Sequence, residues 1–520
     1  MENILFNNLD EADSFHRLEK LRPQKNLKDI LTPGLVRGSS IPAGAGLVYN
    51  YAAKGITEEV LSGLSELAKE QQAVEKYRLL LNGEIMNTGE KRRVLHHLTR
   101  GRLGEDVLSG GINLRQFYLS QQKKISEFAE AVHTGKITGS TGKSFDTVVQ
   151  IGIGGSDLGP RALYLALETY AVMKAHFISN VDPDDAVNVL NSINPETTLF
   201  ILVTKSGTTQ ETLTNMNFVK ETMKASGIKN LNPEKHMIAV TSQTSPLAES
   251  PDYLRSFYID NFIGGRYSST SAVGGAVLSL AFGPDIFQRF LNGAAEADKK
   301  ALETDINKNP SLMDACIGIY ERNVRGYPMT AVLPYSQALN RFPAHLQQLD
   351  MESNGKSVNR DGQTISYKTG PVVFGEPGTN GQHSFYQLLH QGTDIIPLQF
   401  IGFTKSQREI DLVIDGSTSQ QKLNANLAAQ IVAFALGKDD ANPNKRFAGN
   451  RPSSILHGEK LTPESLGALL AHFENKVMFQ GFLWNINSFD QEGVQLGKVL
   501  AKKILTENQI DPLLECFFLV

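Results

Sequence analysis

From Phe145 onwards, short apolar runs rich in β-branched residues alternate with helical stretches, and this rhythm constrains the fold more than any other feature of the chain. The runs are TVVQIGIGG, AHFISN, TLFILVTKSGTT and HMIAVTS, and most of them lead into a loop rich in Gly, Ser or Thr. Runs that are apolar throughout are typical of strands buried on both faces, as in parallel sheets. The chain therefore predicts an α/β fold with a doubly wound, parallel-rich sheet.

The same rhythm returns after a helical stretch at 290–325, in PMTAVLPY, GPVVFGEPGTNGQ and DIIPLQFIGF. A length of 520 residues leaves room for two or more packed units. Letter-by-letter similarity between the two halves is too weak to indicate a repeat. We expect a helical N-terminal region at 1–115, a first α/β domain at 116–290, a second at 291–490, and a C-terminal helix and tail at 491–520.

The charges nearly balance, since 51 Lys and Arg against 55 Asp and Glu give a net charge of -4. Such a chain has no overall field that attracts nucleic acid or an anionic membrane, so any anion must be bound locally. The acidic N-terminus does not resemble a signal peptide, and no window of about 18 apolar residues could span a membrane. Cys316 and Cys516 provide neither a disulfide framework nor a metal-ligand spacing. We therefore expect a cytoplasmic protein with no nucleic-acid or membrane partner.

The segment IGIGGSDLGP (151–160) joins a predicted strand to a helix through several glycines. Glycines let the backbone approach a ligand, and a helix start offers unpaired N–H groups, so an anion or sugar oxygens can bind there. A simple tight turn is the plainer alternative. A dinucleotide site is another, because Asp182 follows at the spacing of a ribose-binding carboxylate; against it, Asp157 stands where the third glycine of that motif belongs.

The segment VTKSGTTQET (203–212) follows an unbroken apolar strand and brings four hydroxyl donors within six residues, from Thr204 to Thr209. Gly207 permits a turn in which backbone N–H groups converge, and the next helix begins at the same place. This pattern favours a cradle for a phosphate monoester, held by hydrogen bonds and the helix dipole without a metal. A Ser/Thr-rich turn with a helix cap is the alternative.

Four further segments contain candidates for acid, base and cation. Arg266 lies between glycines and an aromatic residue, where its guanidinium could face a developing oxyanion, although a solvated arginine is the commoner case. Glu352 precedes a Gly turn at a helix end and could act as a base, or simply be a cap or a surface charge. His383 opens a helix after a Gly-rich loop, which makes a partly buried, orientable imidazole plausible. Gln491 and Lys498 are seven residues apart and would share a helix face.

These segments, in order and spacing, resemble the signature stretches of the phosphoglucose isomerase (glucose-6-phosphate isomerase) family. The resemblance runs from about Val148 to Lys498 and is carried by IGIGGSDLGP, TKSGTTQET, GGRYS, DMESNGKS, GTNGQHSFYQLLHQGT and DQEGVQLGK. It implies two sugar-isomerase (SIS-type) domains and a homodimer that completes each active site across its interface. It also implies reversible conversion of glucose 6-phosphate to fructose 6-phosphate through a cis-enediol(ate), with neither metal nor organic cofactor.

The resemblance assigns roles by motif position. Glu352 would move the proton between C1 and C2, Arg266 would stabilise the enediolate, and His383 with Lys498 would open the ring. Glu211 resembles the family's partner of that histidine. The phosphate would be bound by Thr204, Lys205, Ser206, Thr208 and Thr209, and the sugar by Gly154, Gly155, Ser156 and Gln348, while Gln491 matches the glutamine of the last segment. Gln495 departs from the family's usual glutamate, which puts the local charge partner of Lys498 in doubt.

Two other classes of function stay open at this point. One is a sugar-phosphate-binding regulator without catalysis, which would need the phosphate cradle but not Glu352, His383 and Lys498 together. The other is a nicotinamide-dependent enzyme, which Asp182 suggests.

Overall fold

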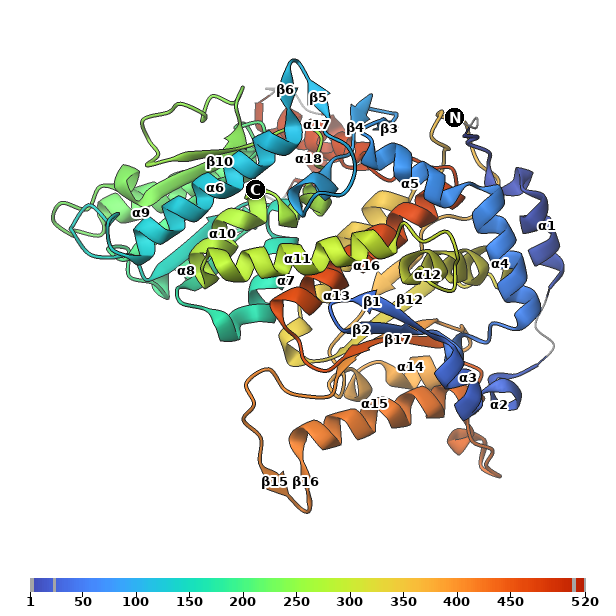
Figure 1. Cartoon of the computed structure of the whole chain (residues 1–520). Helices are drawn as coiled ribbons and strands as arrows, with labels where there is room; N and C mark the ends of the chain where they lie inside the picture. Colours follow the sequence, from blue (N-terminus) through green and yellow to red (C-terminus); the bar gives the residue numbers. More distant parts are fainter. Residues whose placement is uncertain (1–3, 22–24, 507–510, 519–520) are drawn as a thin grey trace.

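The computed structural model describes residues 4–21, 25–506 and 511–518. Within them the chain forms two open sheets, each with helices on both faces (Figure 1). The predicted α/β class with two parallel-rich sheets is thereby confirmed.

The first sheet is parallel throughout and has the strand order β11-β10-β9-β7-β8. Successive residues of its strands face opposite cores: Val148 packs in the cluster that includes α10, and Val149 packs with Val219 of α9. This double burial explains why the strands read as unbroken apolar runs. The strands are β7 Thr147–Ile151, β8 Lys174–Ile178, β9 Thr198–Val203, β10 Met237–Ser242 and β11 Ser256–Ile259. The accompanying helices are α6 Leu114–His133, α7 Leu158–Leu167, α8 Pro183–Asn191, α9 Gln210–Ala225 and α10 Ala272–Phe282.

The second sheet has the order β1-β2-β17-β14-β12-β13. Its four C-terminal strands are parallel, and β2 joins β17 in the antiparallel sense. The strands are β1 Ser40–Gly44, β2 Leu47–Asn50, β12 Met329–Tyr335, β13 Val372–Phe374, β14 Leu398–Phe403 and β17 Ser453–Gly458. The region 1–115, for which the sequence predicts helices, thus also contains strands, and two of them, β1 and β2, belong to the second sheet. The Gly-rich segment at 44–46 turns with positive φ at all three residues, which lets two short strands pair and bury Ile41 and Tyr49.

The two sheets share one strand order, with β8-β7-β9-β10 corresponding to β13-β12-β14-β17. The order reverses between β7 and β9 in one sheet, and between β12 and β14 in the other. Open α/β sheets bind ligands beyond the carboxyl ends of their strands at such a reversal point. The topology thus shows a duplication that the sequence was too divergent to indicate.

Helices from both ends of the chain pack around and between the sheets (Figure 1). The N-terminal ones are α1 Asp13–Lys20, α2 Leu27–Ile30, α3 Pro33–Gly38, α4 Glu58–Glu70 and α5 Ala73–Leu81. Those of the second half are α11 Pro284–Lys300, α12 Pro310–Ile319, α13 Phe342–Gln347, α14 Tyr386–Gln391, α15 Ser419–Leu436, α16 Pro463–Leu483, α17 Gln495–Thr506 and α18 Pro512–Phe517. Three small hairpins complete the chain: β3 Ile85–Asn87 with β4 Arg92–Arg93, β5 Leu108–Ser109 with β6 Ile112–Asn113, and β15 Val413–Ile414 with β16 Ser417–Thr418.

Helix α16 lies in the interior, and of its residues only Glu464 is not buried. Thr462 caps it, accepting the backbone N–H of Ser465 at 3.2 Å. Its Glu474 forms a buried ion pair with Arg100, whose guanidinium also contacts Asp298 at 3.3 Å. Arg100 Nε also donates to Thr270 Oγ1, so this charge cluster supports the 3₁₀ segment Gly265–Thr270.

Because two buried carboxylates surround the guanidinium of Arg100, we expect the free energy of unfolding to depend on pH. Burial raises the pKa of Glu474 to about 7. In the folded chain Glu474 keeps its proton up to about pH 7, whereas in the unfolded chain it releases the proton near pH 4.5. Proton binding by Glu474 therefore stabilises the folded state fully below pH 4.5, and this stabilisation is lost as the pH rises through about 7. We expect the free energy of unfolding of the wild type, relative to Glu474→Gln, to fall by about 1 kcal/mol or more between pH 5 and pH 8 in urea titrations. Glu464→Gln, at an exposed pair with Arg289, should show no such trend.

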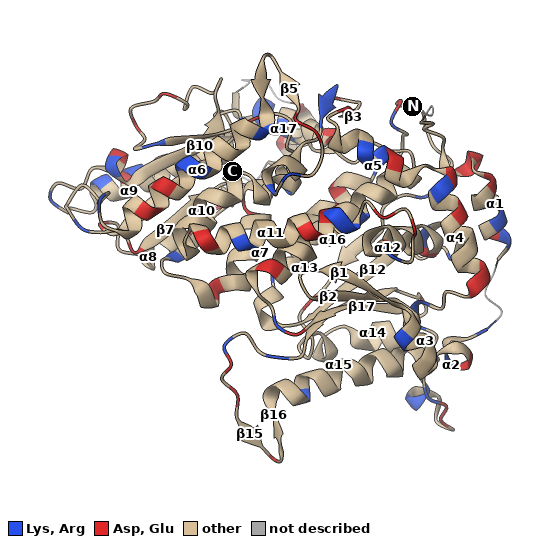
Figure 2. Ribbon diagram, in the orientation of Figure 1, with Lys and Arg blue, Asp and Glu red and all other residues tan. Residues whose placement is uncertain are grey.

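The charged residues of both signs are interspersed over the outer helices, as α1 and α11 illustrate, while β7, β12 and β17 have none (Figure 2). Among the helices of the described residues, we found none that is both long and apolar enough to cross a membrane.

Candidate active site

The first glycine-rich loop lies at the carboxyl end of β7, where the first sheet reverses its strand order. Gly154 has φ +61°, and the loop then forms a single 3₁₀ turn before α7. A Cβ atom on Gly155 would lie 2.1 Å from the carbonyl carbon of Gly265, and one on Gly154 would lie 3.4 Å from Nε2 of Gln348. The loop therefore contacts the backbone just before Arg266, and only glycine at 155 permits that approach.

Arg266 is 2% exposed and stands in the 3₁₀ segment Gly265–Thr270, which leads into α10. Its Nε donates to Ser353 Oγ at 2.7 Å, and its Nη2 donates to the carbonyl oxygens of Ser488 at 2.8 Å and Asp490 at 2.9 Å. Its Nη1 is held more loosely, 3.3 Å from Gln491 Oε1 and 3.5 Å from Glu352 Oε1. One end of the guanidinium is thus fixed to the protein, and the other faces the two candidate side chains.

Glu352 ends a single turn of π-helix, Gln348–Glu352, that follows α13. Its side chain is 22% exposed and forms the ion pair with Arg266. Gln348 begins the same turn, and its buried Oε1 has no hydrogen-bond partner among the described residues. Single π turns are rare and occur often at functional sites. The turn brings Gln348 and Glu352 to the place where the Gly154 loop, Arg266 and Gln491 meet.

The hydroxyl-rich loop follows β9, the strand next to β7. Thr204 Oγ1 lies 3.0 Å from Thr209 Oγ1 and accepts the N–H of Gly207, while Ser206 Oγ accepts the N–H of Thr208 at 3.1 Å. Gly207 has φ +71°, as the predicted turn requires. Within the described residues, no side chain caps the start of α9, so its first N–H groups and these hydroxyls offer a site for an anion.

Lys205 does not point towards this loop's hydroxyls but donates through Nζ to the carbonyl oxygen of Ile263 at 2.9 Å. Burial lowers its pKa, and nearby Asp260 acts in the opposite direction. Because Ile263 stands three residues before Arg266, this bond joins the hydroxyl-rich loop to the segment that contains the arginine. The Lys205 ammonium is thus bound to a backbone carbonyl oxygen, and phosphate binding by Lys205 stays a prediction.

A second Thr-Lys-Ser tripeptide, 404–406, follows β14 at the corresponding place in the second sheet. There the helix start is already occupied, because Asp411 accepts the backbone N–H groups of Ser419 and Gln420 at 3.0 and 2.9 Å. Lys405 pairs with Glu459 on the surface. An internal carboxylate thus takes, at the start of α15, the position that is left without a side-chain cap, among the described residues, at the start of α9.

For three predicted residues, no hydrogen bond or ion pair with Glu352 is found among the described residues. His383 ends the 3₁₀ turn Gly381–His383 and is exposed, contrary to the partly buried imidazole that we predicted; the preceding loop folds over Tyr335 and leaves the ring outside. Lys498 is exposed on α17. Glu211, in the first turn of α9, is partly exposed, and no contact with His383 is found. For these three, the roles implied by the resemblance stay predictions.

Gln491 and Lys498 do not share one helix face, so that prediction is wrong. Gln491 precedes a 3₁₀ turn at Glu492–Val494, and α17 begins only at Gln495. The carbonyl oxygens of Ser488 and Asp490 accept hydrogen bonds from Arg266 and so are not available to a helix that would begin before Gln491. Sequence periodicity could not reveal this tertiary contact.

The residues behind the dinucleotide alternative have structural tasks. Asp157 pairs with Arg161 at 2.7 Å in the first turns of α7. Asp182 caps α8, where its Oδ1 accepts the N–H of Asp184 at 3.0 Å. This capping role explains an aspartate at position 182 without a bound ribose.

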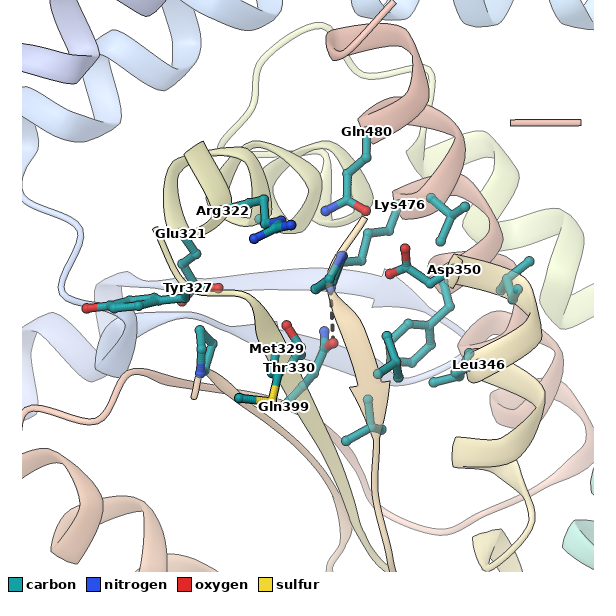
Figure 3. A pocket seen from close by; sticks show the side chains of 18 of the residues that line it. Glu321, Arg322, Tyr327, Met329, Thr330, Leu346, Asp350, Gln399, Lys476 and Gln480 are labelled. Carbon is teal, nitrogen blue, oxygen red and sulfur yellow. Dashed lines mark hydrogen bonds between the residues drawn. The ribbon is translucent and has the colours of Figure 1, made fainter. Parts of the chain in front are cut away.

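Behind the π turn lies an enclosed cavity lined by both polar and apolar side chains, with about 30 Å³ of free space, room for about two water molecules. Figure 3 shows Asp350, Lys476 and Gln480 directed into it from the π turn and from α16. Burial raises the pKa of Asp350 to about 6. Asp350 therefore faces away from the cluster to which Glu352 belongs, two residues later in the same turn.

Known proteins are similar to this chain over most of its length. The family model described as phosphoglucose isomerase matches residues 50–515. Glucose-6-phosphate isomerase from Treponema denticola is 64% identical over 98% of each chain, and the enzyme of that name from Borreliella afzelii is 49% identical over 98% of this chain and 97% of that one. The crystal structure of a glucose-6-phosphate isomerase from Chlamydia trachomatis superposes with a TM-score of 0.90 at 43% identity, covering 96% of both chains. By these matches, the chain belongs to the phosphoglucose isomerase family.

Proposed function

We propose that this protein interconverts glucose 6-phosphate and fructose 6-phosphate. The observation that carries the proposal is the contact of Arg266 with both Glu352 and Gln491, together with a hydroxyl-rich loop and an uncapped helix start after the strand β9, next to β7. A carbon-bound proton next to a carbonyl needs a base on one side and a cation at the forming oxyanion. The phosphate ester needs a tether at a distance from the reacting carbons.

In this proposal the phosphate binds at the start of α9, to the hydroxyls of Thr204, Ser206, Thr208 and Thr209. Glu352 removes the proton from C2 of the open-chain aldose, and the C2–H electron pair forms the C1=C2 bond while O1 takes the negative charge. Arg266 Nη1 stabilises that charge. The acid form of Glu352 then protonates C1, O1 gains a proton, and loss of the O2–H proton leaves the ketone at C2.

Ring opening requires further acid and base groups, for which His383 and Lys498, both exposed in the single chain, are the candidates. We propose that His383, with Glu211 as its partner, and Lys498 act in this step when a second copy associates. Exposed apolar side chains support such an association. The hairpin β15–β16 extends beyond the rest of the chain at the lower edge of Figure 1; Ile414, within β15, is 56% exposed, and Leu412, just before β15, is 69% exposed. Leu496 and Val499 of α17 are exposed as well.

The homodimer can be tested by light scattering. We expect the wild type at twice 57.1 kDa, and we expect Leu412→Asp together with Ile414→Asp to shift it towards the single-chain mass and lower turnover in parallel. Val172→Asp, at an isolated residue 65% exposed, is the matched control and should leave the mass unchanged. A fully active wild type at the single-chain mass would contradict the proposal.

A coupled assay of purified protein with each sugar phosphate, with and without EDTA, tests the activity. We expect turnover in both directions and no effect of the chelator, because hydroxyls, backbone N–H groups and Arg266 supply the positive potential. Binding without turnover would instead indicate a sugar-phosphate sensor. The balanced net charge, a buried Cys316 and an exposed, unpaired Cys516 support a cytoplasmic setting, which cell fractionation would check.

A further inference from the structure

The segment after Glu352 contains a second positively charged side chain, Lys356, that sequence reasoning left without a role. Its ammonium donates to the carbonyl oxygen of Glu352 at 2.8 Å and to that of Asp490 at 3.2 Å, and it pairs with Asp490 Oδ1 at 2.9 Å. Both side chains are largely buried, at 16% and 15% exposure. All three ammonium protons thus have acceptors in two segments that are 134 residues apart.

Gly355 makes this arrangement possible. A Cβ atom at that position would lie 2.4 Å from the carbonyl oxygen of Met351, so only glycine lets the chain turn so tightly after the π turn. The turn returns Lys356 to the carbonyl end of the π turn, where a cation is electrostatically favoured. Thr369 Oγ1 donates to the carbonyl oxygen of Lys356 at 2.6 Å and fixes its backbone.

Through Asp490, Lys356 contacts the segment 488–491. This segment supplies three of the oxygen atoms that Arg266 contacts. The carbonyl oxygen of Asp490 accepts from both Lys356 and Arg266, and Gln491 follows directly. Asn487 donates to Asp490 Oδ2 at 2.7 Å, so the carboxylate is held from both sides. The position of Arg266 relative to Glu352 therefore depends on how this segment is fixed to the π turn.

We propose that Lys356, through Asp490, is a positioning residue that sets the distance between the Glu352 carboxylate and the Arg266 guanidinium. The inference rests on the proposed function, in which Glu352 moves the proton. Lys356 itself contacts neither substrate nor reacting atoms. Its loss would let the π turn and the segment 488–491 move apart, and a displacement of about 1 Å at a reacting group can cost roughly 100-fold in rate.

The test compares Lys356→Met, Asp490→Asn and the double variant. We expect each single variant to lose roughly 10- to 100-fold in kcat, with KM within about threefold, because the phosphate tether lies on a different segment. The double variant should be no more than about threefold slower than Lys356→Met, since both changes remove one interaction. Lys356→Arg, which retains the charge, should recover part of the loss. Binding of a six-carbon polyol 6-phosphate, which has no carbonyl to isomerise, should stay within about threefold of wild type.

The matched control is Lys220→Met, which removes a similarly buried lysine paired with Asp252 at 2.8 Å on the far part of α9. Its kcat should stay near the wild-type value. A wild-type kcat for Lys356→Met, or multiplicative losses in the double variant, would overturn the proposal. A fall in polyol phosphate binding as large as the fall in kcat would do so too. If Lys356→Met does not fold, the kcat values of Asp490→Asn and Lys356→Arg still test the proposal: a wild-type kcat for Asp490→Asn would overturn it.

Failure of this inference and failure of the proposed function can be told apart. If the wild type interconverts the two sugar phosphates and Glu352→Gln does not, a normal Lys356→Met variant rejects only the positioning role. If the wild type shows no turnover, the function itself is rejected.

Discussion

Glu352→Gln should abolish interconversion of the two sugar phosphates, with a loss of kcat of roughly 10²- to 10⁴-fold, the range that general acid–base groups contribute. The amide has nearly the same shape, and its oxygen can still accept from Arg266 Nη1, now 3.5 Å from the carboxylate. What it lacks is the ability to take a proton from carbon. Steady-state kinetics should therefore show a collapsed kcat and a KM within about threefold of wild type, because the phosphate tether is untouched.

Asp350→Asn is the matched control for this change. Asp350 stands in the same π turn, two residues earlier, but is directed into the enclosed cavity beside Lys476 (Figure 3). Its variant should retain kcat within about tenfold of wild type, since the carboxylate does not face the reacting atoms. Near-normal turnover of Glu352→Gln would remove Glu352 from the mechanism, and an equal loss in both variants would point to damage of the turn.

Arg266→Lys should lower kcat by about 100-fold or more, the effect typical of losing a preorganised donor to a developing oxyanion. A lysine retains the charge, but it cannot reach Ser353, Ser488 and Asp490 together while presenting a further N–H to the substrate. The carbonyl oxygens at 488 and 490 would lose their donor, so the segment that includes Gln491 should loosen as well. We therefore expect KM to rise modestly in addition to the fall in kcat.

A buried arginine elsewhere provides the comparison. Arg115 donates to the carbonyl oxygens of Gly101, Leu103 and Gly104 and pairs with Asp106. Arg115→Lys should cost a similar amount of stability, measured as the urea midpoint, and leave kcat near wild type. If the two variants lose activity in parallel with stability, Arg266 has only a structural role.

The local parts of the site could be predicted from the sequence because each depends on neighbours along the chain. The apolar run ending at Val203 and the hydroxyls at 204–209 predict a strand followed by an anion-binding loop, and the structure has both. The sequence also predicts that Glu352 lies at a helix end before a Gly turn, and the structure places it at the end of the π turn. Lys356 was missed, although it stands in the same DMESNGKS segment, because its partner Asp490 lies 134 residues away and no short-range pattern marks the pair.

The sequence by itself determined the α/β class, the strands β7 to β10 and β12 to β14, and the glycines and hydroxyls of the loops, since burial on both faces and turn geometry leave their mark on consecutive residues. Tertiary structure alone decided that β1 and β2 join the second sheet, that Asp411 occupies the start of α15, and that Arg266, held by the carbonyl oxygens of a distant segment, lies beside Glu352. It also decided that His383 and Lys498 stay on the surface of this chain. These outcomes depend on which surfaces meet in three dimensions, and hydrogen bonds between residues hundreds of positions apart impose no periodicity on the sequence.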